Sequence, residues 1–295
     1  MASDQGFRPF ASVLLGVALF SLMDATMKAA SLAAGTYSAL LLRSLFGLAL
    51  SVPAFLAAGG HWPAPDALKV HLTRGVVATG MAFTFFWAIT RRPLAEAIAL
   101  SFIAPLIALY LAAALLGERV RRRAIGASLV GLVGVVVVAL GNGQGGTAPA
   151  GGWLGAASVL TSAVLYAWNL VLQRRQALLA RPLEVVTFQN AIVSLVLIGF
   201  APWFLALPRD PRAWGEIAAA AALSMIAAML FASAYRRAEA QALVPLEYSA
   251  FLWASLFGWL FFAESLRAAT LLGVALIVAA CWIAAPRRRP ETSAL

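Results

Sequence analysis

The feature that most constrains this chain is a series of long apolar segments that recurs from end to end with little polar sequence in between. Of its 295 residues, 62% are hydrophobic and 12% charged, whereas a soluble domain carries about 25% charged residues. A helix that crosses the hydrocarbon core of a bilayer needs about 20 apolar residues. Stretches such as 129–140 lack the alternation of a membrane β-barrel. The sequence therefore predicts an all-α membrane protein.

Segments of spanning length divide the chain into ten predicted transmembrane helices. They fall near residues 10–33, 37–58, 71–91, 94–116, 124–141, 153–176, 184–206, 214–236, 239–263 and 268–285. With an even number of spans both termini share one side, and if that side is inside, fifteen Lys and Arg residues lie inside and five outside. Because cytoplasmic loops are enriched in these residues, we expect both termini in the cytoplasm. We interpret the net charge of +10 as loop charge and not as a nucleic-acid surface.

Two halves of the chain repeat one another at an almost constant offset of 145–147 positions. Four pairs match in order: Asp24-x-x-x-Lys28 with Asn169-x-x-x-Gln173, Arg91-Arg92 with Arg236-Arg237, Gly117-Glu118 with Ala263-Glu264, and Gly126 with Gly273. Each half has an odd number of spans, so the second half must be inverted relative to the first. Inverted repeats are common in transporters, whose halves rock about a central site. We expect repeats at 1–141 and 153–295, the latter with a short basic tail, joined by a Gly-rich linker at 142–152.

The end of each half resembles the EamA domain of the drug/metabolite transporter superfamily. The residues that carry the resemblance are Pro105, Gly117-Glu118, Gly126, Gly131 and Gly134 in the first half, and Ala263-Glu264 and Gly273 in the second. The resemblance implies a central cavity lined by the first four helices of each half, with the fifth and tenth helices peripheral. Length and aromatic content are similar to those of the YddG-like aromatic amino-acid exporters.

The resemblance and the inverted repeat together predict a transporter in the bacterial inner (plasma) membrane. We expect it to export amino acids, aromatic ones in the narrower reading, or similar small metabolites by alternating access. A carrier for nucleotide sugars or drugs is the alternative within the superfamily, and phosphate-bearing substrates should require more than one interior cation. A membrane-embedded enzyme is the alternative from another class. No HExxH, GxSxG or paired His/Cys cluster supports it.

Charged and amide side chains inside the predicted spans are candidates for substrate contact, because such groups are costly in a bilayer. Asp24 and Lys28 lie four positions apart on one helix face and can neutralise each other. Arg43 could bind a substrate carboxylate or pair with Asp24. Asn169, which replaces Asp24 at the repeat position, and Gln189 could orient a zwitterion without a fixed charge.

The ninth span adds Glu247, a candidate proton-coupling carboxylate, shortly after Pro245. Pro105 occupies a comparable place in the fourth span, so the two prolines are candidate hinges. Further cavity candidates, which could stack on a substrate or bind it by hydrogen bonds, are Phe83, Trp87, Phe102, Trp168, Tyr248, Ser249 and Trp253.

The sequence gives no reason to expect a metal or cofactor. The single cysteine, Cys281, lies in the last span, and His61 and His71 are too isolated for a metal site. The expected partners are the small-molecule substrate and the lipid bilayer. The glycines at 126, 131 and 134 permit close helix approach, either within the chain or in a homodimer.

Overall fold

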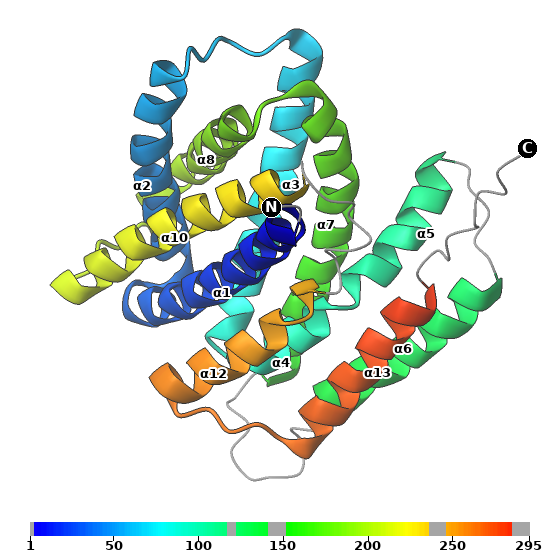
Figure 1. The fold of residues 1–295 in the computed structure, drawn as a ribbon. Coiled ribbons are helices and arrows are strands. Elements are labelled where there is room, and N and C mark those ends of the chain that lie inside the picture. The colour runs from blue at the N-terminus through cyan, green and yellow to red at the C-terminus, as the bar shows by residue number, and fades with distance from the viewer. Residues whose placement is uncertain (1–2, 117–121, 141–151, 236–245, 285–295) are drawn as a thin grey trace, which may run out of the picture.

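A computed structural model describes residues 3–116, 122–140, 152–235 and 246–284, and over these residues the chain is helical and contains no β-strand (Figure 1). The linker up to residue 151, Glu118, the Arg236-Arg237 pair and the hinge candidate Pro245 lie outside the described residues. For the described part of the chain, the prediction of an all-α protein is confirmed.

The helices follow the predicted order of the two halves. Those of the first half are α1 (Ser3–Ala34), α2 (Thr36–Ala57), α3 (Pro65–Ile89), α4 (Leu94–Ser101), α5 (Ala104–Leu116) and α6 (Arg122–Leu140). Those of the second half are α7 (Gly152–Leu179), α8 (Pro182–Ile198), α9 (Ala201–Phe204), α10 (Pro211–Tyr235), α12 (Ala250–Phe262) and α13 (Ala268–Ala284). Helix α3 starts at Pro65, because proline suits the first helical turn, where its missing N–H needs no partner. This start precedes the predicted one and places His71 and Arg74 inside the helix.

The described helices supply apolar segments for all ten predicted spans. Five are long and apolar enough to cross a membrane: Ala11–Ala34, Thr36–Ala57, Pro65–Ile89, Trp153–Gln173 and Pro211–Phe231. Five are shorter: Leu94–Ala108, Ile125–Val138, Pro182–Ile198, Ala250–Phe262 and Ala268–Ala280. Each overlaps one predicted span, which agrees with a protein that crosses the membrane many times.

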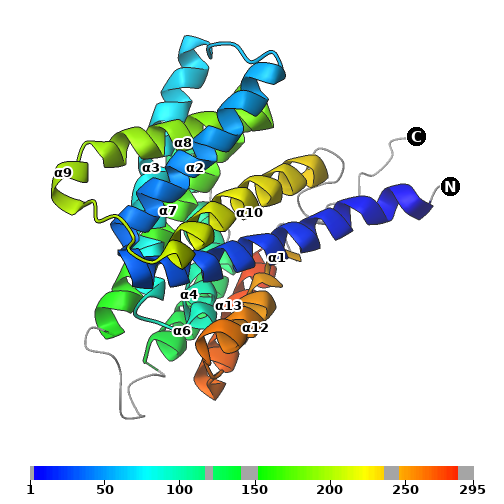
Figure 2. The same ribbon diagram turned by 90° about the vertical axis from the view of Figure 1, so that its left-hand side faces the viewer.

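The helix pairing is that of two related halves about a two-fold axis. Helix α1 packs on α10, and their counterparts α7 and α3 pack on each other in the same way (Figures 1 and 2). Three further pairs, α2 with α8, α4 with α12 and α6 with α13, each join a helix to its own counterpart. Phe102 and Tyr248, which are 146 positions apart, touch with ring centroids 5.1 Å apart. Because equivalent residues meet only on the axis, the axis passes between these two rings.

Large apolar side chains cover the outside of the bundle. Examples that are more than 60% exposed are Leu129, Trp203, Leu252 and Trp282. Exposed apolar side chains on this scale are unusual for a soluble monomer. They suit a helical surface in contact with lipid chains, where the backbone polar groups are satisfied within each helix.

Helices α6 and α13 lie side by side at the edge of the bundle (Figure 1), as expected for the fifth and tenth spans. A Cβ on Gly134 would lie 2.7 Å from the carbonyl oxygen of Gly273, and one on Gly131 would lie 2.5 Å from Leu106 Cδ1. Gly126 has no neighbour within 4 Å. Two of the three expected packing glycines therefore make their close approach inside the chain.

Candidate functional site

Asp24 of α1 and Arg43 of α2 form the charged centre of the candidate site. Both lie deep among the helices, and their opposite charges interact. Each side chain nevertheless keeps part of its surface accessible. None of the ion pairs among the described residues joins the two. Of the partners predicted for Asp24, the structure thus brings Arg43 near it, but not into direct contact.

Arg43 retains unused hydrogen-bonding capacity. Its Nε is buried and has no partner among the described residues, although a buried unsatisfied donor costs about 1–3 kcal/mol. Its guanidinium Cζ lies 5.7 Å from the ring centroid of Phe86, which is buried in the aromatic run 83–87. Phe83 packs, half-buried, against the same core. The guanidinium therefore rests beside a ring and has a donor that a ligand oxygen could use.

The fourth and ninth spans are interrupted where they meet at the two-fold axis. Helices α4 and α5 are separated by Phe102 and Ile103, and Pro105 stands in the first turn of α5. Helix α12 starts after Ser249, whose hydroxyl is buried without a partner among the described residues. The rings of Phe102 and Tyr248 pack edge to face at this point. Interrupted helices near the midplane are where inverted-repeat transporters place their binding sites.

The second half also contributes polar candidates. Gln189 of α8, the helix that packs on α2, has a buried Oε1 without a partner among the described residues. The charge of Glu247 acts on Tyr166 of α7, which also interacts with Arg74 of α3. The second half therefore contributes a buried amide oxygen from Gln189 and a carboxylate, Glu247, whose charge acts on Tyr166.

A hydrogen-bonded network, which the sequence did not reveal, joins α3, α7 and α8 near the α2–α3 and α7–α8 turns; we call this end of the bundle the His71 end. Arg74 donates from Nε to Asn169 Oδ1 at 2.9 Å and from Nη1 to Gln176 Oε1. Gln176 Nε2 lies 2.6 Å from His71 Nδ1, and His71 Nε2 lies 3.0 Å from Glu184 Oε1. The side-chain oxygen of the cavity candidate Asn169 is therefore already bound by Arg74. The sequence does not reveal the network because its side chains come from helices that are far apart along the chain.

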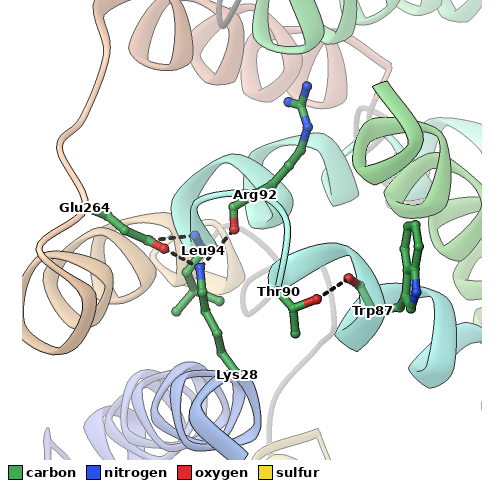
Figure 3. Close-up of polar contacts among 6 residues, drawn as sticks. All are labelled: Lys28, Trp87, Thr90, Arg92, Leu94 and Glu264. Atoms are coloured by element: carbon green, nitrogen blue, oxygen red, sulfur yellow. Dashed lines mark hydrogen bonds and ion pairs between the residues drawn. The ribbon is translucent and has the colours of Figure 1, made fainter. Parts of the chain in front are cut away.

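Lys28 forms its ion pair with Glu264 and not with Asp24, so the predicted pairing on one helix face is wrong. Lys28 Nζ also donates to the carbonyl oxygen of Arg92 at 2.9 Å, and Glu264 Oε2 accepts from the N–H of Leu94 at 2.7 Å (Figure 3). Four positions on a helix allow a local pair, but the ammonium pairs instead with a carboxylate that lies just beyond the end of α12. Lys28 is therefore a link between helices at the end opposite the His71 end, which we call the Lys28 end.

Three tryptophans predicted to line the cavity have other surroundings. Trp168 is 43% exposed and lines a membrane-facing groove of about 550 Å³ between α3 and α7, among apolar side chains. Trp87 lies 3.5 Å below the guanidinium of Arg91 at the end of α3, and it points away from Lys28 (Figure 3). Trp253 stacks on Phe257 of the same helix. Hydrophobicity does not separate such positions from the interior, because in a bilayer both faces of a helix are apolar.

In the part of the chain that the structure describes, no three His, Cys, Asp or Glu side chains gather as metal ligands would. The candidate groups are one carboxylate and one guanidinium on neighbouring helices, the aromatic pair at the axis, and the partnerless polar atoms of Arg43, Gln189 and Ser249. These groups can bind positive and negative charges, and they can pair with both hydrogen-bond donors and acceptors.

Comparison with known proteins identifies relatives over almost the whole chain. The chain is 27% identical over 262 residues to the pseudopaline exporter CntI of two Pseudomonas aeruginosa strains, UCBPP-PA14 and PAO1. The match covers 89% of this chain and 90% of each exporter. The chain is also similar to a protein of known crystal structure, with 25% sequence identity and a TM-score of 0.61. The match covers 93% of this chain and 96% of that protein's chain.

The model of the EamA-like transporter family matches the chain twice, at residues 9–140 and 153–285. These two matches fall on the halves that the offset of about 145 residues defines. Helical fold, paired halves and membrane-facing surface agree with them. The chain is a multi-pass membrane transporter that belongs to the EamA-like transporter family of the drug/metabolite transporter superfamily.

Proposed function

We propose that this transporter exports small zwitterionic metabolites of the amino-acid class, which bind between Asp24 and Arg43 and cross the membrane by alternating access. The observation that carries the proposal is the separation of these two opposite charges in the interior. A ligand with an ammonium and a carboxylate complements both, and it would supply the acceptor that Arg43 Nε lacks. Asn169, Gln189, Glu247, Tyr248 and Ser249 are proposed to complete the polar wall.

The rings at the axis support a substrate with an apolar part. Phe102 and Tyr248 present an aromatic pair where the two halves meet, and Phe86 lies beside the guanidinium of Arg43. Aromatic side chains combine a large apolar surface with few rotatable bonds. The relatives named as pseudopaline exporters support the export of a small metabolite, while the substrate of this chain rests on its own residues.

A nucleotide-sugar carrier is less well supported, because a diphosphate needs several free interior cations. Lys28 is bound by Glu264, and Arg74 is bound by Asn169 and Gln176. Arg43 is thus the interior cation, among the described spans, that retains a partnerless donor. A single guanidinium with a free donor suits a substrate that carries one carboxylate better than one that carries a diphosphate.

The decisive experiment is transport by the purified protein in lipid vesicles, screened over the twenty amino acids and related metabolites with and without a pH gradient. We expect Arg43→Gln and Asp24→Asn to weaken substrate binding, since a lost hydrogen bond to a charged group costs about 1.5–3 kcal/mol, roughly a 10- to 150-fold change. Arg212→Gln, which removes an exposed guanidinium on α10, is the matched control. Failure of the wild-type protein to move any of these compounds, or normal transport by both variants, would refute the proposal.

Coupling and orientation are parts of the same proposal. Glu247 is proposed to carry the proton, so Glu247→Gln should transport at a rate that no longer responds to a pH gradient. Hinge motion is assigned to the interruptions at Pro105 and near Pro245.

The charge bias of the loops supports both termini in the cytoplasm of a bacterial inner membrane, which places the Lys28 end outside. Reporter fusions at each terminus test the orientation.

A further inference from the structure

Lys28 is held from three sides by elements that are remote from it in the sequence. Its ammonium forms an ion pair with Glu264, donates to the carbonyl oxygen of Arg92 at 2.9 Å, and lies 4.9 Å from the ring centroid of Phe262 (Figure 3). Lys28 belongs to the first half and Glu264 to the second, 236 positions later. The ammonium therefore ties α1 to both the α3–α4 turn and the end of α12.

The local structure of α12 is adapted to present the Glu264 carboxylate. Ala263 adopts the left-handed conformation, with φ 52°, and the Glu264 N–H returns to the Gly258 carbonyl oxygen at 3.1 Å, which ends the helix. A Cβ at Gly258 would lie 2.5 Å from Glu264 Oε2, so glycine leaves the space that the carboxylate occupies. The second carboxylate oxygen accepts the N–H of Leu94, the first residue of α4.

The ion pair is well shielded from solvent. The side chains of Lys28 and Glu264 are 7% and 15% exposed. Arg92 offers Lys28 its backbone oxygen, while its guanidinium points away (Figure 3) and pairs with Glu96 at 3.1 Å. Removing one partner of a buried pair leaves an uncompensated charge, which is strongly unfavourable. Opening this end would break the ion pair together with the hydrogen bonds to the Arg92 carbonyl oxygen and the Leu94 N–H. The contacts thus join the elements at the Lys28 end, where α4 begins and α12 ends.

The repeat has no charged side chain at the position that corresponds to Lys28. The counterpart of Lys28, 145 positions later, is Gln173 of α7, an uncharged side chain. Gln173 is exposed and has no hydrogen-bond partner among the described residues. An amide cannot form an ion pair, so the Lys28 ammonium has no equivalent at the matching position of α7.

We propose that the Lys28–Glu264 pair is a one-sided latch: it must break for the Lys28 end to open, and it biases the resting transporter towards closure at that end. The proposal rests on the alternating access proposed above, but it concerns which end is closed and not what is carried. It assigns Lys28 and Glu264 a positioning role, outside the Asp24 and Arg43 site.

The latch can be tested by chemical labelling without any substrate. In a Cys281→Ser background, which removes the only native cysteine, Ser101→Cys places a reporter beside Phe102 at the end of α4. Membrane-impermeant maleimide is added to vesicles that carry the protein in one or the other orientation, so that each end of the helix bundle is tested separately. Lys28→Gln or Glu264→Gln should raise labelling from the Lys28 side at least about tenfold, because the variant lacks the ion pair that must break for this end to open, and the charge left behind favours exposure to water. Labelling from the opposite side should fall.

Two further variants keep the outcome decisive. Exchange of the charges, Lys28→Glu with Glu264→Lys, should restore slow labelling from the Lys28 side if the pair acts as a latch. Glu216→Gln removes an ion pair within α10 and should leave labelling unchanged. Gel filtration separates folded from aggregated variants, and the exchange variant provides the test if a single variant does not fold. Unchanged labelling in folded Lys28→Gln and Glu264→Gln would overturn the latch, while the transport screen would still decide the proposed function.

Discussion

The contact between α6 and α13 allows a stability prediction whose size can be worked out from the structure. A methyl group added by Gly134→Ala would place its Cβ 2.7 Å from the Gly273 carbonyl oxygen. Ordinary Cβ contacts start near 3.4 Å, and 3.4 − 2.7 leaves a deficit of about 0.7 Å, so the helices must separate by an amount of this order. A backbone carbonyl cannot relieve the clash by changing rotamer. Overpacking of this kind costs about 1–3 kcal/mol.

Gly126→Ala on the same helix is the matched control, because a Cβ there has no neighbour within 4 Å. Both substitutions gain the same helix propensity, up to about 1 kcal/mol, so their difference isolates the packing cost. At roughly 2–4 °C per kcal/mol, Gly134→Ala should unfold about 2–12 °C below Gly126→Ala. Tryptophan fluorescence of the purified protein during heating measures this. Equal unfolding temperatures would refute the reasoning that the carbonyl contact sets the helix spacing.

Three more predictions follow from the described contacts. Ala263→Gly should raise stability by about 0.5–1 kcal/mol, measured by thermal unfolding, because glycine adopts the left-handed conformation at a helix end without the steric cost; no gain would mean that the turn is not strained. Gln176→Leu should destabilise by about 1–3 kcal/mol, since Arg74 and His71 each lose a partner, whereas Gln173→Leu on the same helix should be neutral by the same assay. Trp168→Ala should transport at close to the wild-type rate in vesicles, because the ring faces the membrane; a large loss would show that this groove takes part in transport.

The sequence predicted the fold class because the length of the apolar segments can be read without knowing any tertiary contact. It predicted two related halves because matching residues recur at a constant offset. It placed Asp24 and Arg43 near each other by charge complementarity. It failed for Lys28, because four-residue spacing favours a local partner whereas tertiary packing supplied Glu264 from 236 positions away. It missed the Arg74 network because the partners Asn169 and Gln176 lie 95 and 102 positions later in the sequence.

The network at the His71 end fixes the direction in which its hydrogens point. A guanidinium can only donate, so the amide oxygen of Gln176 must face Arg74 and its NH₂ must face His71 Nδ1. That nitrogen is then an acceptor, and the imidazole carries its hydrogen on Nε2, directed at Glu184. The ring is thereby locked as one neutral tautomer, and a one-way row of donors runs from a buried cation to a carboxylate on α8. Reversing that row would require the Gln176 amide to turn its NH₂ towards Arg74, which has no acceptor to offer.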